Sequence, residues 1–150
     1  MGTSLTKEQI RELAAKSLAG IKNSYAPYSH FHVSAVLLSE NGNIYTGNNI
    51  ENAAYTPSVC AERCAFFKAV SEGKTEFRAI AIVGGPKGKE PENFCAPCGV
   101  CRQVMREFCD PEEFRIILGA GTGEKQVYLL KELLPLSFGP DNLNGKEKHS

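Results

Sequence analysis

The spacing of apolar side chains predicts an amphipathic helix at the start of the chain. Apolar residues recur there every three or four positions, which places them on one face of a helix ending near Asn23. Thr6 and Gln9 have the spacing of a capping box, in which each side chain bonds the other residue's backbone N–H. Ala26-Pro27 then breaks the pattern. We expect a helix over about residues 6–23.

Short stretches rich in β-forming residues predict the strands of a sheet. They cover residues 31–38, 44–47, 79–83, 114–118 and 126–129. Asn41-Gly42 is the signal of a two-residue hairpin, because both residues tolerate positive φ. The first two strands are therefore expected to pair antiparallel. Gly84-Gly85-Pro86 is expected to end the third strand.

Helical patterns separate the later strands. One helix is expected from Pro57 to near Gly73, another from Pro97 to about Phe108, and a short one over 130–134. A proline suits a helix's first turn, where its missing N–H is no loss. Strands alternating with helices imply right-handed crossovers and a parallel section of sheet. The predicted fold class is α/β: a three-layer α/β/α arrangement with a mixed five-stranded sheet.

Length and composition favour one domain that acts on a small molecule. The chain has 150 residues, 42% of them apolar, which suits a single domain over 1–150 with a loose polar tail from about Asn144. Seventeen basic residues balance seventeen acidic ones, so a nucleic-acid partner is not expected. No apolar run approaches the roughly 18 residues that suggest a membrane span. Six cysteines without a secretory signal favour metal binding or chemistry, and a cytoplasmic location.

Two cysteine motifs have the spacing of a catalytic zinc site. Cys60-Ala61-Glu62 and Pro97-Cys98-Gly99-Val100-Cys101 together supply three thiols, which leave the fourth corner of a zinc tetrahedron open. Both motifs fall at predicted helix N-termini, where thiolates are favoured. Glu62 is placed to transfer protons at a water in the open corner. Arg63 is one helical turn from Cys60 and can donate hydrogen bonds to a ligand sulfur.

The remaining cysteines leave alternatives open. Cys95 makes a Cys-x-x-Cys-x-x-Cys run that resembles the start of an iron–sulfur motif, but no Cys-Pro closes the run. Cys64 lies one turn after Cys60 and can compete as a ligand. We favour the interpretation that Cys64, Cys95 and Cys109 are small buried side chains. A structural zinc with Cys64 or Cys95 as the fourth thiolate is the alternative.

Five sequence blocks in order resemble the small homotetrameric cytidine deaminases. The blocks are Ala26-Pro27-Tyr28-Ser29-x-Phe31, Asn49-Ile50-Glu51-Asn52-Ala53, Cys60-Ala61-Glu62-Arg63, Pro97-Cys98-Gly99-Val100-Cys101-Arg102-Gln103 and Leu133-Leu134-Pro135-Leu136-Ser137-Phe138-Gly139-Pro140. The zinc motif itself is the known signature of zinc nucleobase deaminases. The resemblance implies one Zn²⁺ per chain and hydrolytic deamination of cytidine and 2′-deoxycytidine, with release of ammonia, in pyrimidine salvage.

The resemblance also assigns a nucleoside pocket. It implies that Phe31 packs against the pyrimidine ring and that the backbone N–H of Ala61 holds a ring carbonyl. It also implies that Asn49 and Glu51 bind the ribose hydroxyls. Two residues that are two apart on a strand end face the same way, and their amide and carboxylate can bind a hydroxyl. Taken alone, such a polar strand end more often makes turn hydrogen bonds.

Two aromatic residues are expected to complete a neighbouring subunit's site. The resemblance implies that Tyr55 and Phe138 reach across a homotetramer with shared active sites. The sequence departs from the usual family pattern at His32, Ser34 and Cys64, none of which is an expected ligand.

Glu62 is expected to carry every proton transfer of the reaction, so that no histidine is needed. The rival substrates are free cytosine, a modified nucleoside such as blasticidin S, and a polynucleotide base. Asn49 and Glu51 argue for a free ribose, and the neutral charge argues against a long nucleic-acid strand.

Overall fold

One mixed sheet of five strands forms the centre of the protein, which is described for residues 4–144 by a computed structural model. The strands are β1 (Phe31–Ser39), β2 (Ile44–Asn48), β3 (Phe77–Pro86), β4 (Arg115–Gly119) and β5 (Lys125–Leu129), in the order β2-β1-β3-β4-β5. Neighbouring strands are antiparallel except β3 and β4, which are parallel. The mixed five-stranded sheet is as predicted.

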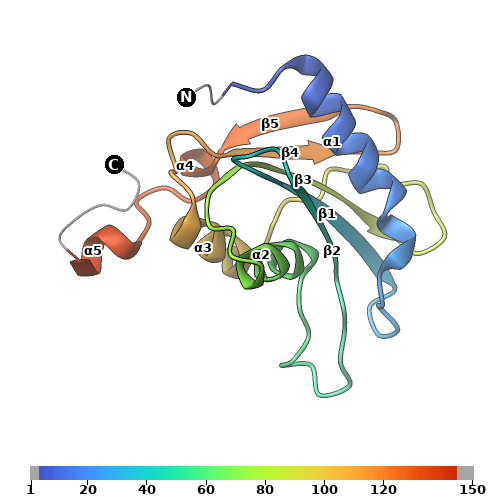
Figure 1. Cartoon of the computed structure of the whole chain (residues 1–150). Helices are drawn as coiled ribbons and strands as arrows, with labels where there is room; N and C mark the ends of the chain where they lie inside the picture. Colours follow the sequence, from blue (N-terminus) through green and yellow to red (C-terminus); the bar gives the residue numbers. More distant parts are fainter. Residues whose placement is uncertain (1–3, 145–150) are drawn as a thin grey trace.

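Helices cover both faces of the sheet, so the three-layer α/β/α fold class is confirmed (Figure 1). The helical segments are α1 (Lys7–Ala19), a 3₁₀ turn (Ile21–Asn23), α2 (Ala61–Ser71), α3 (Gly99–Phe108), α4 (Leu130–Leu133) and α5 (Pro140–Asn144). Helix α1 lies on one face, and α2 and α3 lie on the other (Figure 1). No helix within residues 4–144 is long and apolar enough to cross a membrane.

Two apolar clusters, one on each face, hold the layers together. On the α1 face, Leu13 packs with Val36 and Leu38 of β1. On the other face, Leu37 of β1 packs with Phe66 of α2 in the larger cluster. Successive residues of a strand point to opposite faces, so the unbroken apolar run of β1 supplies both clusters.

The first helix begins as the sequence predicts. Thr6 Oγ1 accepts from the Gln9 backbone N–H at 3.0 Å, and Gln9 Oε1 accepts from the Thr6 backbone N–H at 2.9 Å. This reciprocal pair confirms the capping box. The α-helix ends at Ala19, before the predicted end near Asn23. The last part of the predicted segment forms the 3₁₀ turn Ile21–Asn23 instead.

Three predicted boundaries are wrong because longer-range pairing decides them. Helix α2 begins at Ala61 rather than at Pro57, since Val59 pairs with Ile50 through two backbone hydrogen bonds of 2.9 and 3.0 Å. Strand β3 continues through Gly84-Gly85-Pro86 because these residues pair with the start of β1. The β1–β2 connection spans residues 40–43, not two residues.

Helix α3 also starts later than predicted. Its first residue is Gly99, and Cys98 is the N-cap with an extended backbone. Pro97 therefore precedes the helix rather than occupying its first turn. Helix α5 was not predicted at all, and the tail expected from about Asn144 falls on 145–150, outside the described residues.

We call residues 134–144 the C-terminal arm. Side chains of α3 anchor this arm and Leu133, the residue before it. Arg102 Nη1 donates to the Leu133 carbonyl at 2.6 Å, and Gln103 Nε2 donates to the Phe138 carbonyl at 2.9 Å. The arm is thus tied to the helix whose first turn contains Cys101.

Arg106 makes the third anchor through side chains of the arm. Its Nε donates to Ser137 Oγ and its Nη2 to Asp141 Oδ1, both at 2.8 Å. A Cβ at Gly139 would lie 2.3 Å from the Arg106 Cζ atom, so a larger residue there would displace this guanidinium.

Gly47 of β2 sets how closely α2 approaches the sheet. A Cβ at Gly47 would lie 2.4 Å from the Ala61 carbonyl oxygen and 2.5 Å from the Ala65 nitrogen, both backbone atoms. We predict that Gly47→Ala lowers the free energy of unfolding by about 1–3 kcal/mol, because α2 must shift outward. Denaturant titration of the zinc-loaded protein measures this loss.

Gly99→Ala is the matched control for this prediction. A Cβ at Gly99, the first residue of α3, meets no atom within 4 Å. Gly99→Ala should therefore keep the free energy of unfolding of the wild-type protein. Equal free energies of unfolding for the two variants would contradict the close approach of α2 to β2.

Candidate metal centre

Three cysteines meet where α2 and α3 begin. Cys60 is the N-cap of α2, Cys98 is the N-cap of α3, and Cys101 lies in the first turn of α3. The first N–H groups of a helix have no partner within the helix and carry a partial positive charge. Two such helix ends therefore favour the thiolate form of these cysteines.

The sulfur atoms have the separations that a tetrahedral zinc needs. Cys60 Sγ lies 3.8 Å from Cys98 Sγ, which lies 3.7 Å from Cys101 Sγ, and all three are within 4.8 Å of one another. Zinc–sulfur bonds of about 2.3 Å at tetrahedral angles separate two sulfurs by about 3.8 Å. The three residues thus fit a zinc ion.

Charge at the sulfur cluster is balanced by Arg63. Its Nη2 donates to Cys60 Sγ at 3.4 Å. The pKa of Cys60 is lowered to about 5, chiefly because the Cys101 thiol donates a hydrogen bond to its sulfur and also because Arg63 does so. The pKa of Cys101 is raised by the same contact. A guanidinium beside thiolates offsets the negative charge that three of them give a zinc ion.

Glu62 lies beside the cysteines and is almost fully buried. Only 4% of its surface is exposed. Burial raises the pKa of its carboxyl to about 7, and the neighbouring Cys60 thiolate adds to the rise. A carboxyl in such a place can take up and release protons near neutral pH.

A pocket of about 310 Å³ is lined by Cys60, Cys98 and Glu62. This volume is at the lower end of the range for small-molecule sites, about 300–1,000 Å³. Asn49 and Glu51 line the same pocket, as does Ala61. The structure therefore brings together the expected metal ligands and three of the expected substrate-binding residues.

The expected aromatic residues lie outside this pocket. Phe31 is 39% exposed and lines an adjoining pocket of about 200 Å³, which shares Cys95 with the first. Tyr55 is 72% exposed and contacts the Tyr28 ring edge to face, with centroids 6.1 Å apart. Phe138 is 58% exposed on the C-terminal arm.

No fourth thiol joins the cluster. Among the described residues, the group of potential metal ligands within 4.8 Å contains Cys60, Cys98 and Cys101 alone. Cys95 lines the pocket, and burial raises the pKa of its thiol to about 11, which disfavours the thiolate that zinc needs. Cys109 is in the apolar core. The geometry favours an open catalytic site over the closed structural site with Cys64 or Cys95.

Sequence reasoning missed several residues of the pocket wall. Val33, Ser58, Val59 and Ala96 line it. Val33 had a usable signal, because it is two residues after Phe31 on a strand and faces the same side. Ser58 and Val59 were assigned to a helix, which hid their position on the loop that leads to Cys60.

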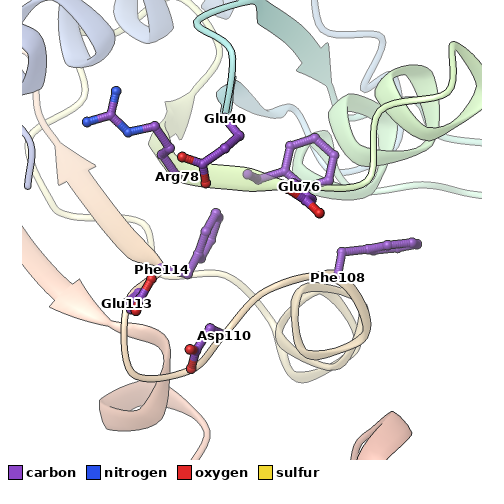
Figure 2. A pocket seen from close by; sticks show the side chains of 8 residues that line it. Glu40, Glu76, Arg78, Phe108, Asp110, Glu113 and Phe114 are labelled. Carbon is purple, nitrogen blue, oxygen red and sulfur yellow. The ribbon is translucent and has the colours of Figure 1, made fainter. Parts of the chain in front are cut away.

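A second hollow lies at the far end of α3 and has a different character. Figure 2 shows its acidic and aromatic lining, with Glu40, Glu76, Asp110 and Glu113 beside Phe108 and Phe114. Phe108 ends α3, whereas Cys98 caps its start. Since none of the described residues lining this hollow is a cysteine or histidine, it is separate from the metal centre.

The fold, the three thiols and the buried carboxyl define a zinc-dependent deaminase. The model of the family described as "Cytidine and deoxycytidylate deaminase zinc-binding region" matches residues 7–116. The chain belongs to the cytidine deaminase family, and its cofactor is zinc.

Relatives and solved structures agree over most of the chain. A cytidine deaminase of Sporosarcina psychrophila is 42% identical over 135 residues, which are 90% of this chain and 95% of the relative. The crystal structure of a cytidine deaminase from Burkholderia pseudomallei superposes with a TM-score of 0.75 at 40% identity, covering 89% of this chain and all of that one. The Mycobacterium tuberculosis enzyme gives 0.68 at 31% identity, with coverage of 91% and 99%.

We predict that Cys101→Ala weakens zinc binding by about 100-fold or more. Each ligand supplies a large share of a zinc-binding free energy of about 10–16 kcal/mol. Cys64→Ala, on the same helix as Glu62 but outside the sulfur cluster, should keep full zinc content. Metal analysis after dialysis against a weak chelator measures both variants. Full zinc content in Cys101→Ala, or its loss in Cys64→Ala, would mean that the ligand set is different.

Proposed function

We propose that this chain catalyses the hydrolytic deamination of cytidine and 2′-deoxycytidine to the uridine products, with release of ammonia. The observation that carries the proposal is a single pocket that Cys60, Cys98 and the buried Glu62 line together with Asn49 and Glu51, while Cys101 completes the sulfur cluster behind it. Relatives of 42% identity are named cytidine deaminases, which supports the same substrate class.

Cys60, Cys98 and Cys101 hold the zinc in this proposal. Zinc bound there supplies a hydroxide nucleophile at neutral pH, because it brings the pKa of water down to about 7. Arg63 donates to Cys60 Sγ and keeps the cluster from becoming too electron-rich. Ala61, Glu62 and Asn49 line the pocket beside these cysteines, where the base would bind.

Glu62 moves the protons. Its carboxylate accepts a proton from the nucleophile and delivers one to ring N3, which makes C4 electrophilic. Hydroxide then adds at C4, and Glu62, ionised again, takes the proton of the new C4 hydroxyl and gives it to the amino group. The C4–N bond breaks, the C4 carbonyl forms and ammonia leaves. Burial of Glu62 keeps competing water away from these transfers.

Other residues of the chain orient the nucleoside. Ala61 is the first residue of α2, so its N–H is one of the unpaired donors of a helix N-terminus and can hold the ring carbonyl. Phe31 packs against the pyrimidine from the adjoining pocket. Asn49 and Glu51 bind the ribose hydroxyls with the hydrogen-bonding capacity that their side chains retain.

We predict that Glu62→Gln keeps one zinc per chain and loses about 10²–10⁴-fold in turnover of cytidine, because the amide cannot transfer protons. Glu72→Gln, an exposed glutamate at the other end of α2, is the matched control and should keep full activity. The assay follows the loss of the ultraviolet band of cytidine. Turnover by Glu62→Gln at the wild-type rate would contradict the assignment.

The same assay with other substrates separates the rival functions. We expect cytidine and 2′-deoxycytidine to react, and free cytosine and cytidine monophosphate to react poorly, since a neutral chain offers no field for a phosphate. Turnover of free cytosine alone would argue against the ribose site. No turnover of any of them by zinc-loaded protein would redirect the search to a modified nucleoside such as blasticidin S.

We further propose a homotetramer in which each active site is shared. Tyr55 and Phe138 support this, because both rings are largely exposed and neither lines the pocket of its own chain. The hydrogen bond from Gln103 to the Phe138 carbonyl holds the arm so that the ring points away from its own core.

We predict that Phe138→Ala and Glu62→Gln complement each other. Each variant alone should be at least about 10-fold less active, whereas tetramers refolded from a mixture should recover part of the activity, since some sites then combine an intact Glu62 with an intact Phe138. Leu143→Ala is the control, because Leu143 is another exposed apolar residue of the arm, 77% exposed against 58% for Phe138. A light-scattering mass of one chain, or no recovery on mixing, would contradict shared sites.

We propose that the enzyme acts as a single domain over residues 1–150, in the cytoplasm, in pyrimidine salvage and without a nucleic-acid partner. Cys60, Cys64, Cys95, Cys98 and Cys101 form no disulfide in the described chain, as expected in a reducing compartment. The balanced charge supports a small neutral substrate.

A further inference from the structure

Asn49 is the first residue after β2, and its side chain forms hydrogen bonds with the backbone of β1. The last β1–β2 pair is Ser34 with Asn48. Beyond it, Asn49 Oδ1 accepts from the Val33 backbone N–H at 2.9 Å, and Asn49 Nδ2 donates to the Phe31 carbonyl at 2.8 Å. In an extended strand the backbone groups of residues i and i+2 point the same way, so one carboxamide can bond both. Asn49 thus replaces the missing peptide partner.

Glu51 fixes the loop that leads into the same strand. Its Oε1 accepts from the backbone N–H groups of Tyr28 at 2.9 Å and Ser29 at 3.1 Å. Its Oε2 accepts from the Ser29 hydroxyl, which in turn accepts from the Phe31 backbone N–H at 3.1 Å. These donors favour the carboxylate and hold the pKa of Glu51 below its usual range. The loop Tyr28–His30 is therefore held at three points.

The loop needs such support. His30 has a positive φ of 57°, a left-handed conformation that is costly for a residue with a side chain. It lies directly between the segment bonded by Glu51 and the segment bonded by Asn49. On one side the start of β1 is held by β3, because Phe31 pairs with Pro86, and the Lys87 backbone N–H donates to the His30 carbonyl at 2.8 Å. Asn49 and Glu51 supply the anchors on the other side, next to β2.

The segment that is held forms the walls of the nucleoside pocket. Val33 lines the pocket that contains the cysteines, and Phe31 lines the adjoining one. Each of the two side chains still has capacity for substrate, because a carboxamide offers a second N–H and a carboxylate has about four acceptor positions. A contact with ribose and a contact with the loop are therefore compatible.

We propose that Asn49 and Glu51 are positioning residues that fix the Tyr28–Val33 segment, and with it the Phe31 and Val33 walls, before substrate binds. The proposal rests on the proposed deaminase function only for its effect on turnover. Its core is a property of the free protein. Asn49 and Glu51 then have two roles: they bind the ribose hydroxyls, and they hold the pocket walls that contact the base.

The test uses 2′,3′-dideoxycytidine, which lacks the 2′- and 3′-hydroxyls, and two variants, Asn49→Ala and Ser29→Ala. Ser29 does not line the pocket that contains Asn49 and Glu51. In zinc-loaded Asn49→Ala we expect kcat/KM to fall about 10- to 100-fold for cytidine, and by a similar factor for 2′,3′-dideoxycytidine, since two hydrogen bonds to the wall are lost. Ser29→Ala removes the hydroxyl between Glu51 and Phe31 and should lower both values as well.

Hydrogen exchange of the substrate-free protein gives a readout that does not depend on activity. We expect faster amide exchange at residues 28–33 in Asn49→Ala and Ser29→Ala. Asn41→Ala is the matched control, because Asn41 also bridges backbone and side-chain groups, but at the opposite end of β1. It should leave residues 28–33 and turnover unchanged.

Two results would overturn the proposal. One is unchanged exchange at residues 28–33 in both variants. The other is a loss confined to cytidine, with wild-type kcat/KM for dideoxycytidine, which would leave a ribose contact only. If the wild-type protein deaminates no cytosine nucleoside, the proposed function fails, and the exchange result still decides the positioning role.

Discussion

The convergence of two helix N-termini is the constraint on which the site depends. Cys60 and Cys98 can lie 3.8 Å apart because α2 and α3 begin at the same place, with both residues as extended N-caps. Gly47 lets α2 lie directly on the backbone of β2, and the parallel crossover from β3 to β4 carries α3 to the same face. The sheet therefore determines where α2 and α3 begin, and with them the positions of Cys60 and Cys98.

The same edge of the sheet supplies both the chemistry and the recognition. Glu62 follows Cys60 by two residues and is buried by the packing of α2, whereas Asn49 and Glu51 follow the end of β2 at the same pocket. Glu62, the proposed proton-transfer group, thus has a dry environment, and Asn49 and Glu51, the proposed hydroxyl-binding groups, have a wetter one. Glu62 is buried because it lies in the first turn of α2, and Asn49 and Glu51 are more exposed because they follow the end of β2.

The features that depend on neighbouring residues could be predicted from the sequence. The Thr6–Gln9 capping box, the five strands and the cysteine trio follow from propensity and spacing. The boundaries that failed were set by partners far along the chain. Val59 is extended because it pairs with Ile50, and Gly84-Gly85-Pro86 remain in β3 because β1 pairs with them. The bonds of Asn49 to Phe31 and Val33 could not be read from the sequence for the same reason.

The anchors of the C-terminal arm differ in what they recognise, and this divides the arm into positions free to vary and positions that must change together. Arg102 and Gln103 bond the carbonyls of residues 133 and 138, which every amino acid possesses. The path of the arm therefore does not depend on which side chain stands at position 138, and the Phe138 ring can be selected for the proposed shared site alone. Arg106 instead bonds the side chains of Ser137 and Asp141, so positions 106, 137 and 141 are expected to covary.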